Sequence, residues 1–385
     1  MSRWAAGRNV LAFVALAGIV ACIAGYFTNP ARLFQSYMVA FAYTTFVGLG
    51  AFFFVMVQFL TGSAWSVTLR RIMENVMITL PLGLVLFIPI VLGMSEIYPW
   101  MNQELVNSDP VLKAKSGYLS QNMFALRTVI YFLLWSLWAG SIYRQSTKQD
   151  SERSIQQMHI ASKWSAPGLF LAVAIGSMAS FDWLMSLEPK WYSTIFGLVT
   201  LSGGALSFFS IVTLVCLGFR RAGILQNTIT REHYHDLGKW LFAMTAFYTY
   251  VAFSQYMLIW YANLPEETVW YRHRMEGSWL AISLAMPFLR FLIPFFALLC
   301  RPAKRSLKMI AFIAVWSLVV EYIDLYWIVM PTYYKMGPEL HWLDLATLVT
   351  TVSLCGLVFW SRFGKHKLVP VGDLRLEQSL HFENA

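Results

Sequence analysis

Charged residues are scarce in this chain: Asp, Glu, Lys and Arg make up 13% of its 385 residues, whereas soluble domains contain about 25%. Hydrophobic residues make up 58%. This composition excludes a soluble domain as the main part of the chain and is typical of a multi-span membrane protein. Little sequence remains outside the apolar runs, so any catalytic domain has to come from another chain.

Cysteine is also scarce, and no histidine falls in an apolar run. The four cysteines show no paired spacing, which argues against a disulfide framework, a zinc site or a cysteine-held iron–sulfur cluster; they are Cys22, Cys216, Cys300 and Cys355. Bis-histidine haem inside the membrane is excluded by the positions of His159, His233, His235, His273, His341, His366 and His381. His233 and His235 are expected in a solvated loop. We expect no covalently bound or metal cofactor in this chain.

Ten apolar stretches are long enough to cross ~30 Å of hydrocarbon. They cover residues 9–27, 34–58, 75–95, 122–143, 165–182, 192–217, 238–261, 279–299, 307–330 and 343–361. We therefore expect an all-α membrane protein, with one integral membrane domain over residues 1–385 and a cytoplasmic tail at 362–385. The longest connections are expected at 96–121 and 144–164.

Lys and Arg are unevenly distributed between the two sides of the membrane. If the connections alternate in side, twenty of the 29 Lys and Arg residues fall on the side of the N-terminus and seven on the other, while Arg127 and Arg290 lie within spans. The positive-inside rule then predicts cytoplasmic N- and C-termini. The net charge of +9 follows from this bias and favours contact with anionic lipids. It gives no reason to expect nucleic acid.

Three charges lie deep in apolar runs: Arg290, Glu321 and Asp324. Such groups cost several kcal/mol in hydrocarbon and commonly mark an ion or proton path. At 1.5 Å per residue, Arg290 lies ~17 Å and Glu321 ~14 Å from the outer ends of consecutive antiparallel spans. Depth counting therefore predicts an ion pair between them. Pro287 and Pro294 are expected to open the helix around Arg290.

Asp182, Glu96 and Arg127 lie nearer the outer side. With the deep charges, they are expected to form a polar ladder from that side to the middle of the membrane. Asp182 is read either as a helix cap or as a proton-accessible carboxylate. Two interpretations of the ladder remain open. One is a proton-conducting or quinol-linked site, and the other is a static ion pair that locks the helices together.

Two other spans contain polar residues, and each set can be interpreted in two ways. The seventh span places polar side chains in hydrocarbon, where they either pack or line a quinone pocket: Tyr250, Ser254, Gln255 and Tyr256. The third span opens with Arg70, Arg71 and Glu74, which form either a helix-surface ion pair or a proton entry. Its two prolines, Pro81 and Pro89, predict a kinked helix.

Three stretches of the chain resemble a known family. They are Leu60 to Glu74, with Leu-Thr-Gly-x-x-Trp-Ser and Arg-Arg-Ile-Met-Glu, then Phe181 to Gly197 and Asp236 to Trp270. They are similar to the second polysulfide-reductase-type (NrfD-like) membrane subunit of alternative complex III. This F subunit is also described as quinone-binding subunit 2 of quinol:cytochrome c oxidoreductase. The resemblance covers residues 34–360 and favours this subunit over its paralogue, the C subunit.

The resemblance implies an architecture and a location. The family fold is two four-helix bundles, expected here at about 34–182 and 192–330, with peripheral helices at 9–27 and 343–361. It implies the bacterial inner membrane and a complex that oxidises quinol and passes electrons to a periplasmic acceptor of the cytochrome c type. The bundle symmetry rests on the resemblance, because the sequence contains no strong internal repeat.

The resemblance also implies partners and roles. The expected partners are the NrfD-like C subunit, an iron–sulfur/molybdopterin-like periplasmic protein, multihaem and monohaem cytochromes c, small membrane subunits and lipids. Haem and iron–sulfur clusters are expected on those subunits, and quinone or quinol is a candidate ligand. This chain would be a non-catalytic or quinone-handling subunit without its own redox centre. By position, Glu321, Asp324, Arg290 and Asp182 would belong to a periplasm-facing proton half-path.

Two other classes of protein fit the same pattern. A proton-coupled secondary transporter also has many spans and charges near the middle of the membrane, but transporters usually contain inverted repeats. A purely structural scaffold subunit would use the same charges as internal ion pairs. The two interpretations of the charges differ for Glu321→Gln. In a scaffold subunit, this substitution would change assembly without changing proton release.

Overall fold

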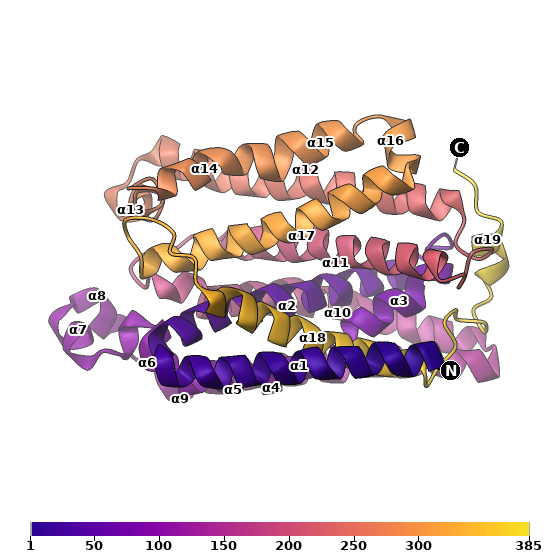
Figure 1. Cartoon of the computed structure of the whole chain (residues 1–385), viewed down its shortest axis with the longest axis horizontal. Helices are drawn as coiled ribbons and strands as arrows, with labels where there is room; N and C mark the ends of the chain where they lie inside the picture. The colour runs from indigo at the N-terminus through magenta and orange to yellow at the C-terminus, as the bar shows by residue number, and fades with distance from the viewer. Residues whose placement is uncertain (1, 385) are drawn as a thin grey trace.

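The computed structural model describes residues 2–384, with side chains from residue 7 onward. The chain folds into an array of long helices that run side by side, and no strand occurs among the described residues (Figure 1). An all-α architecture is therefore confirmed. The side chain of Arg3, one of the cations in the charge count, lies outside the described part, as does residue 385 of the predicted tail.

Nine helical segments of the described chain are long and apolar enough to cross a membrane. Six of them are α1 (Ser2–Thr28), α2 (Pro30–Leu60), α9 (Gln121–Glu152), α10 (Ile155–Trp183), α11 (Phe196–Arg221) and α18 (Trp342–Phe363). The α17 segment (Leu307–Val329) continues into η4 (Met330–Thr332). This finding makes the protein a multi-pass membrane protein.

The two remaining segments are interrupted helices. One consists of α3 (Val67–Met77), α4 (Leu82–Leu86) and α5 (Ile88–Leu92), and the short helix α6 (Met94–Ile97) follows it. The other consists of α14 (Trp279–Pro287), the π-helical turn η3 (Phe288–Leu292) and α15 (Ile293–Leu298). Proline removes a backbone donor, so the kink predicted from Pro81 and Pro89 is confirmed.

The seventh predicted span, 238–261, lies in α12 (Arg231–Ala262). This helix is as long as its neighbours and lies alongside them (Figure 1), but it is not among the nine apolar segments. The tyrosine, threonine, serine and glutamine side chains of α12 lower its mean hydropathy below that of the nine apolar segments.

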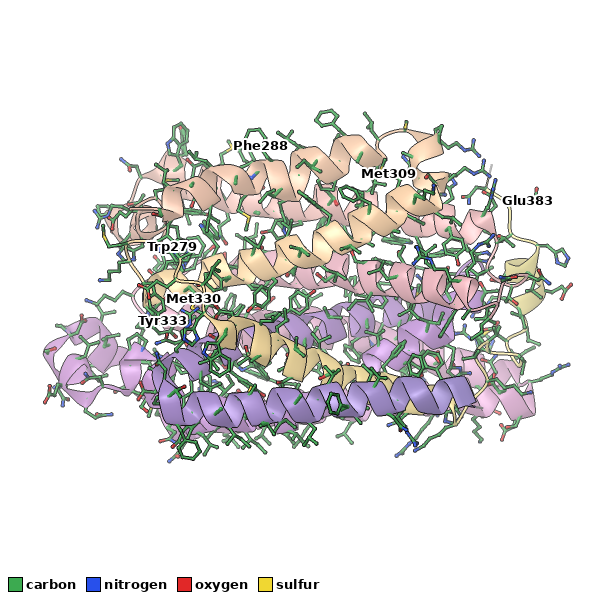
Figure 2. The ribbon with its side chains drawn as sticks, in the orientation of Figure 1. Trp279, Phe288, Met309, Met330, Tyr333 and Glu383 are labelled. Atoms are coloured by element: carbon green, nitrogen blue, oxygen red, sulfur yellow. The ribbon has the colours of Figure 1, made fainter. Side chains whose placement is uncertain are left out.

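The array has two ends, which we name by the short helices that lie there (Figure 1). The α13 end carries η1 (Pro99–Met101), α7 (Gln103–Ser108), α8 (Pro110–Lys115), η2 (Met185–Leu187) and α13 (Pro265–His273). The α16 end carries α16 (Arg301–Arg305), α19 (Leu376–Leu380) and both chain termini. Figure 2 shows Met330 and Tyr333 toward the α13 end and Glu383 at the α16 end.

Helix α2 forms the centre of the array. It packs against α3, α10, α11, α17 and α18, and nearly all of its residues are buried. Its approach to α11 depends on small residues: a Cβ atom on Gly50 would lie only 2.8 Å from the carbonyl oxygen of Gly204. Small residues allow this close backbone packing in membranes. The two halves of the chain therefore meet along a seam between α2 and α11.

A buried ion pair attaches α18 to the start of α2. Arg32 donates to Asp344 at 2.5 Å, and Ser36 donates to the other oxygen of the same carboxylate at 2.6 Å. The Arg32 guanidinium also lies 4.9 Å from the ring centre of Tyr334. The sequence places Arg32 in an outer connection, yet it is only 2% exposed.

The segment 144–164 is helical except at Arg153 and Ser154, which corrects the expectation of a long connection there. Helix α9 continues to Glu152 and α10 begins at Ile155, with only Arg153 and Ser154 between them. Polar residues replace the apolar run here because the helices extend beyond the apolar layer, so hydropathy alone mistakes a polar helix end for a loop. The other long connection, 96–121, contains α7 and α8.

The C-terminal segment 364–384 crosses the α16 end and contacts both halves of the chain. Asp373 pairs with Arg70 at 2.6 Å, and the Ser379 hydroxyl donates to the Trp65 carbonyl at 3.0 Å. Beyond them, Asn384 donates to the Glu232 carbonyl at 3.3 Å. The tail therefore joins α3 to α12.

Two cationic neighbours enclose Glu74 beneath this tail. Its carboxylate lies 3.4 Å from Arg70 and 3.1 Å from Arg71, and all three side chains are buried. The ion pair predicted here exists, but it lies in the protein interior instead of on a helix surface.

The tail also corrects the expectation for His233 and His235. Both lie in the first turns of α12 and are buried, at 0% and 5% exposure. The His233 ring accepts from the Thr230 backbone at 3.1 Å, as part of a helix cap, and lies beside Phe382. The segment looks like a polar loop in sequence, but the tail covers it.

The Arg32–Asp344 pair yields a stability prediction. Asp344→Ala leaves a guanidinium buried without its counter-charge, so we expect a loss of about 3–5 kcal/mol, measured by thermal or denaturant unfolding in detergent. Lys148→Ala is the control, since Lys148 and Glu152 are 56% and 44% exposed and such surface pairs contribute less than about 1 kcal/mol. Equal effects of the two substitutions would contradict this assignment.

Docking of the tail is expected to depend on pH. Burial tends to raise the pKa of Asp373, but the charges of Arg70 and Arg375 outweigh this effect and hold that pKa below its ordinary value. A carboxyl group with a depressed pKa stabilises docking above about pH 4, and this contribution is lost as the pH falls further. We expect Asp373→Asn to raise hydrogen exchange of residues 370–380 several-fold at neutral pH. Glu377→Gln, on the exposed face of α19, should leave the exchange unchanged.

Candidate functional site

Arg290 occupies the π-helical turn η3, between Pro287 and Pro294. The prolines interrupt the normal i→i−4 hydrogen bonds, and a π-turn of this kind is frequent at functional sites. The helix opening predicted around Arg290 is therefore observed. Arg290 is 4% exposed, so its cation points into the protein.

Two carboxylates and one phenol contact this cation. Arg290 Nη2 donates to Glu321 Oε2 and, at 3.2 Å, to Asp324 Oδ2. The Tyr248 hydroxyl donates to the same Asp324 oxygen at 2.6 Å. The guanidinium carbon lies 3.8 Å from the centre of the Tyr248 ring. The predicted Arg290–Glu321 pair is confirmed, and α12, η3 and α17 meet here in what we name the central cluster: Tyr248, Arg290, Glu321 and Asp324.

Helix α11 completes the central cluster by having no side chain at Gly203. A Cβ atom at this position would lie 2.6 Å from Glu321 Oε1 and 2.8 Å from Arg290 Nη2. A side chain at this position would therefore displace the carboxylate and guanidinium groups of the ion pair. Gly203 was not predicted from the sequence, where its position in Ser202-Gly203-Gly204 was the available signal.

The central cluster contains one permanent cation and two carboxyl groups. With both carboxylates ionised, its net charge is −1, and with one proton bound it is neutral. Because an uncompensated charge in the protein interior is costly, the composition of the cluster provides a place for one exchangeable proton. No group of His, Cys, Asp and Glu within the described residues is arranged to hold a metal ion.

A cavity of about 460 Å³ extends from the central cluster toward the α13 end, between α12, α14 and α17. Tyr248, Arg290 and Asp324 line its inner end, whereas Glu321 lies behind them. Its rim includes Phe253, Leu284 and Phe288, which are 58%, 62% and 57% exposed, and Phe288 lies at the outer edge of the array (Figure 2). The cavity therefore opens sideways, toward the region that lipid would occupy.

Gln255 and Tyr256 line this cavity, as two of the four residues proposed from the seventh span. Gln255 donates to the Tyr271 hydroxyl at 3.2 Å and accepts from Ser193 at 3.2 Å. The other two do not line the cavity. Tyr250 is 68% exposed, and Ser254 donates to the Tyr250 carbonyl. These two residues lie on the opposite face of α12, so the prediction for them is corrected.

Asp182 and Arg127 form a separate cluster between α9 and α10. Two guanidinium nitrogens each donate to one carboxylate oxygen at 2.9 Å, and Tyr131 donates at 2.8 Å. Asp182 is fully buried. This pair is neutral without a bound proton. It therefore matches a structural ion pair better than a helix cap or a free carboxylate.

The expected continuous ladder is thus replaced by two clusters on different helices. Glu96 belongs to neither, because it lies in α6 with an exposed side chain. Depth along a helix does not show which face carries the residue, so residues at neighbouring depths can belong to different helix pairs.

A third ion pair, missed in the sequence, fixes the wall of the cavity. Arg274 is 1% exposed and donates to Glu188 at 2.8 Å and to the Ile328 carbonyl at 2.6 Å. Its guanidinium stacks 3.5 Å from the Trp270 ring centre. In the sequence, Arg274 falls in an outer connection between spans, so its side chain is expected to be solvated. The Trp270-x3-Arg274 spacing was the one available signal.

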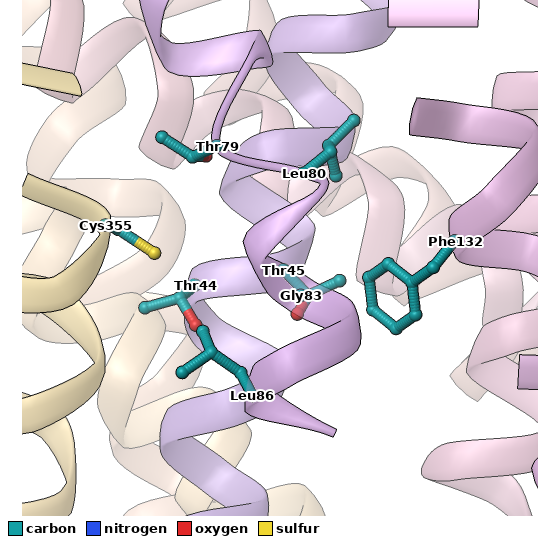
Figure 3. A pocket seen from close by; sticks show the side chains of 8 residues that line it. All are labelled: Thr44, Thr45, Thr79, Leu80, Gly83, Leu86, Phe132 and Cys355. Atoms are coloured by element: carbon teal, nitrogen blue, oxygen red, sulfur yellow. The ribbon is translucent and has the colours of Figure 1, made fainter. Parts of the chain in front are cut away.

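Among the other hollows, one of about 250 Å³ is lined by Ser136, Leu137, Gly140, Ser141, Arg144 and Gln145, and three more are either very small or mainly apolar. A space of about 10 Å³ at the break between α3 and α4 is lined by Thr44, Thr45 and Thr79 (Figure 3). It has room for a single water molecule and excludes an organic ligand. Two apolar grooves, of about 420 and 260 Å³, flank the seam between α2 and α11.

Comparison with known proteins does not extend this description. A search with models of protein families finds no match to the chain, and a search among curated proteins finds none.

Proposed function

We propose that the chain is a membrane subunit of a quinol-oxidising complex of the alternative complex III type, namely its second NrfD-like (F) subunit in the bacterial inner membrane. The sequence resemblance of Leu60 to Glu74, Phe181 to Gly197 and Asp236 to Trp270 supports the family. One structural observation carries the function: a cavity that opens sideways and ends on a cluster of one cation and two carboxyl groups.

The proposed topology has ten spans, with α12 counted as the tenth. Both termini lie at the α16 end (Figure 1), which requires an even number of crossings. We assign this end to the cytoplasm from the Lys and Arg bias. The two proposed bundles are α2, α3–α6, α9 and α10, and then α11, α12, α14–α15 and α17, with α1 and α18 peripheral. Lipid chains suit the two apolar grooves along the seam between α2 and α11.

The cavity suits a quinol for three reasons. Its volume of about 460 Å³ falls in the usual range for small-molecule sites. Its walls are mainly apolar and aromatic, with a few polar groups at defined places, and its sideways opening admits a membrane-soluble molecule. Oxidation of a quinol to a quinone releases two protons and two electrons. The electrons would go to haem or iron–sulfur centres on partner subunits, since this subunit is proposed to hold no redox centre.

The carboxyl groups are assigned to the protons. Asp324 lines the cavity, so it is the first acceptor for a hydroxyl proton of the quinol. Glu321 shares Arg290 with Asp324 and lies behind it, which makes it the second site. Neutrality favours one proton on the pair at a time, so a proton gained by one carboxyl promotes release from the other. The cavity faces the periplasm in the proposed orientation.

A secondary transporter is disfavoured by the places where helices are broken. Transporters built from repeats carry their broken helices at corresponding positions of the two halves. Here the broken helices are the second of the first proposed bundle, α3–α6, and the third of the second bundle, α14–α15. These positions do not correspond.

The proton role predicts the effect of Glu321→Gln. Removing this carboxyl leaves Arg290 and Asp324 as a neutral pair without an exchangeable proton. We expect proton movement per quinol oxidised to fall at least fivefold in proteoliposomes that contain the intact complex and a pH-sensitive dye. Glu266→Gln, at an exposed position of α13, is the control. Normal proton coupling in Glu321→Gln, with changed assembly only, would favour the scaffold.

The cavity predicts the effect of Leu284→Trp. An indole at this rim position would narrow the sideways opening, so we expect the KM for quinol to rise at least fivefold in steady-state assays. Leu299→Trp is the matched control, because Leu299 is similarly exposed, at 51%, and does not line the cavity. An unchanged KM in Leu284→Trp would argue against quinol entry between α12 and α14.

A further inference from the structure

Three buried hydroxyl groups near the central cluster have no hydrogen-bond partner among the described residues. They belong to Ser207, Thr245 and Ser317, which are 0%, 0% and 3% exposed. The Nε and Nη1 atoms of Arg290 are also buried without a partner. Buried polar groups are normally satisfied, so this concentration of unsatisfied groups requires an explanation.

The three hydroxyls each lie about one helical turn from a residue in or beside the central cluster, on its α16 side. Ser207 follows Gly203 by four residues on α11, and Ser317 precedes Glu321 by four on α17. Residues four apart share a helix face and differ in depth by ~6 Å. Thr245 precedes Tyr248 by three on α12. Because Gly203, Glu321 and Tyr248 meet in or beside the cluster, the hydroxyls one turn away converge on the same space.

Neighbouring hydroxyls on α11 and α12 do have hydrogen-bond partners, so the lack of a partner is specific to these three positions. Ser210 donates to the Leu206 carbonyl at 2.9 Å, and Thr249 donates to the Thr245 carbonyl at 2.9 Å. Helices α11 and α12 therefore each offer a carbonyl four residues back as a partner. Ser207, Thr245 and Ser317 do not use it, which leaves their hydroxyls available to a ligand between the helices.

We propose that a small group of bound water molecules lies between α11, α12 and α17, held by Ser207, Thr245, Ser317 and Arg290. Water suits these groups because it donates to hydroxyl oxygens and accepts from both hydroxyls and the guanidinium. A cation would be repelled by Arg290. An anion would be disfavoured beside two carboxyl groups that have only one counter-charge between them.

With this water site, the two carboxyl groups of the central cluster have different surroundings. Asp324 lines the cavity toward the α13 end, and Glu321 lies next to the water on the α16 side. If the proposed function holds, on which this consequence rests, Glu321 exchanges protons with the bound water while Asp324 exchanges them with the ligand. The water site itself depends only on the hydroxyl geometry.

The direct test is a cryo-EM map of the protein purified with its native subunits, at a resolution near 2 Å. We expect ordered solvent density within about 3 Å of at least two of the three hydroxyl oxygens. The proposal would be overturned if the space contained no density and each hydroxyl bonded the carbonyl four residues back, on Gly203, Leu241 and Ile313.

Ser207→Ala provides an independent thermodynamic test. If water satisfies the hydroxyl, its removal should lower the Tm at least as much as Ser210→Ala, the same change at a fully buried serine with a carbonyl partner. If the space is dry, deleting an unsatisfied hydroxyl should raise the Tm instead, which would contradict the proposal. Neither readout depends on quinol or proton transfer. Bound water together with normal coupling in Glu321→Gln would count against the proposed function alone.

Discussion

The guanidinium of Arg290 is the group on which the rest of the structure depends. A permanent cation in the membrane interior has to be neutralised by protein, and this requirement draws several helices to one point. Glu321 and Asp324 supply the counter-charges from α17, and Tyr248 supplies a ring and a hydroxyl from α12. Helix α11 presents Gly203 to the ion pair, where a Cβ atom would lie 2.6 Å from Glu321 Oε1. The cavity begins where these helices separate again.

The ion pairs of this protein differ in charge balance, and this difference supports the proposed assignment of the central cluster to proton exchange. Arg32 with Asp344, Arg127 with Asp182 and Arg274 with Glu188 each match one cation to one carboxylate. A proton added to such a pair creates a net positive charge, which burial opposes. The central cluster is one cation short, so it is neutral only with a proton bound. Composition therefore separates the central cluster from three other pairs that are also largely buried.

Most of the fold could be predicted from the sequence, because hydropathy and length identify membrane helices directly. Depth counting also predicted the Arg290–Glu321 pair, since consecutive antiparallel helices share a depth scale. The rest depended on which face of each helix points inward. A span such as α12, with polar side chains on more than one face, gives no such signal, so Gln255 and Tyr250 looked equivalent. Arg274, His233 and the helical segment 144–164 were misread because polar composition does not distinguish solvated residues from covered ones.

The central cluster also explains how carboxyl groups with access to two sides could avoid forming an open proton leak. On the proposed function, Asp324 exchanges with the cavity and Glu321 with bound water. A continuous chain of water through the same space would let protons pass without any coupling to quinol. Arg290 lies between the two compartments and remains positively charged, and a fixed cation of this kind raises the energy of a hydrated proton beside it. A proton can then pass only as a neutral carboxyl group. Arg290 would serve at once as the counter-ion that retains the acids and as the barrier that makes protons use them.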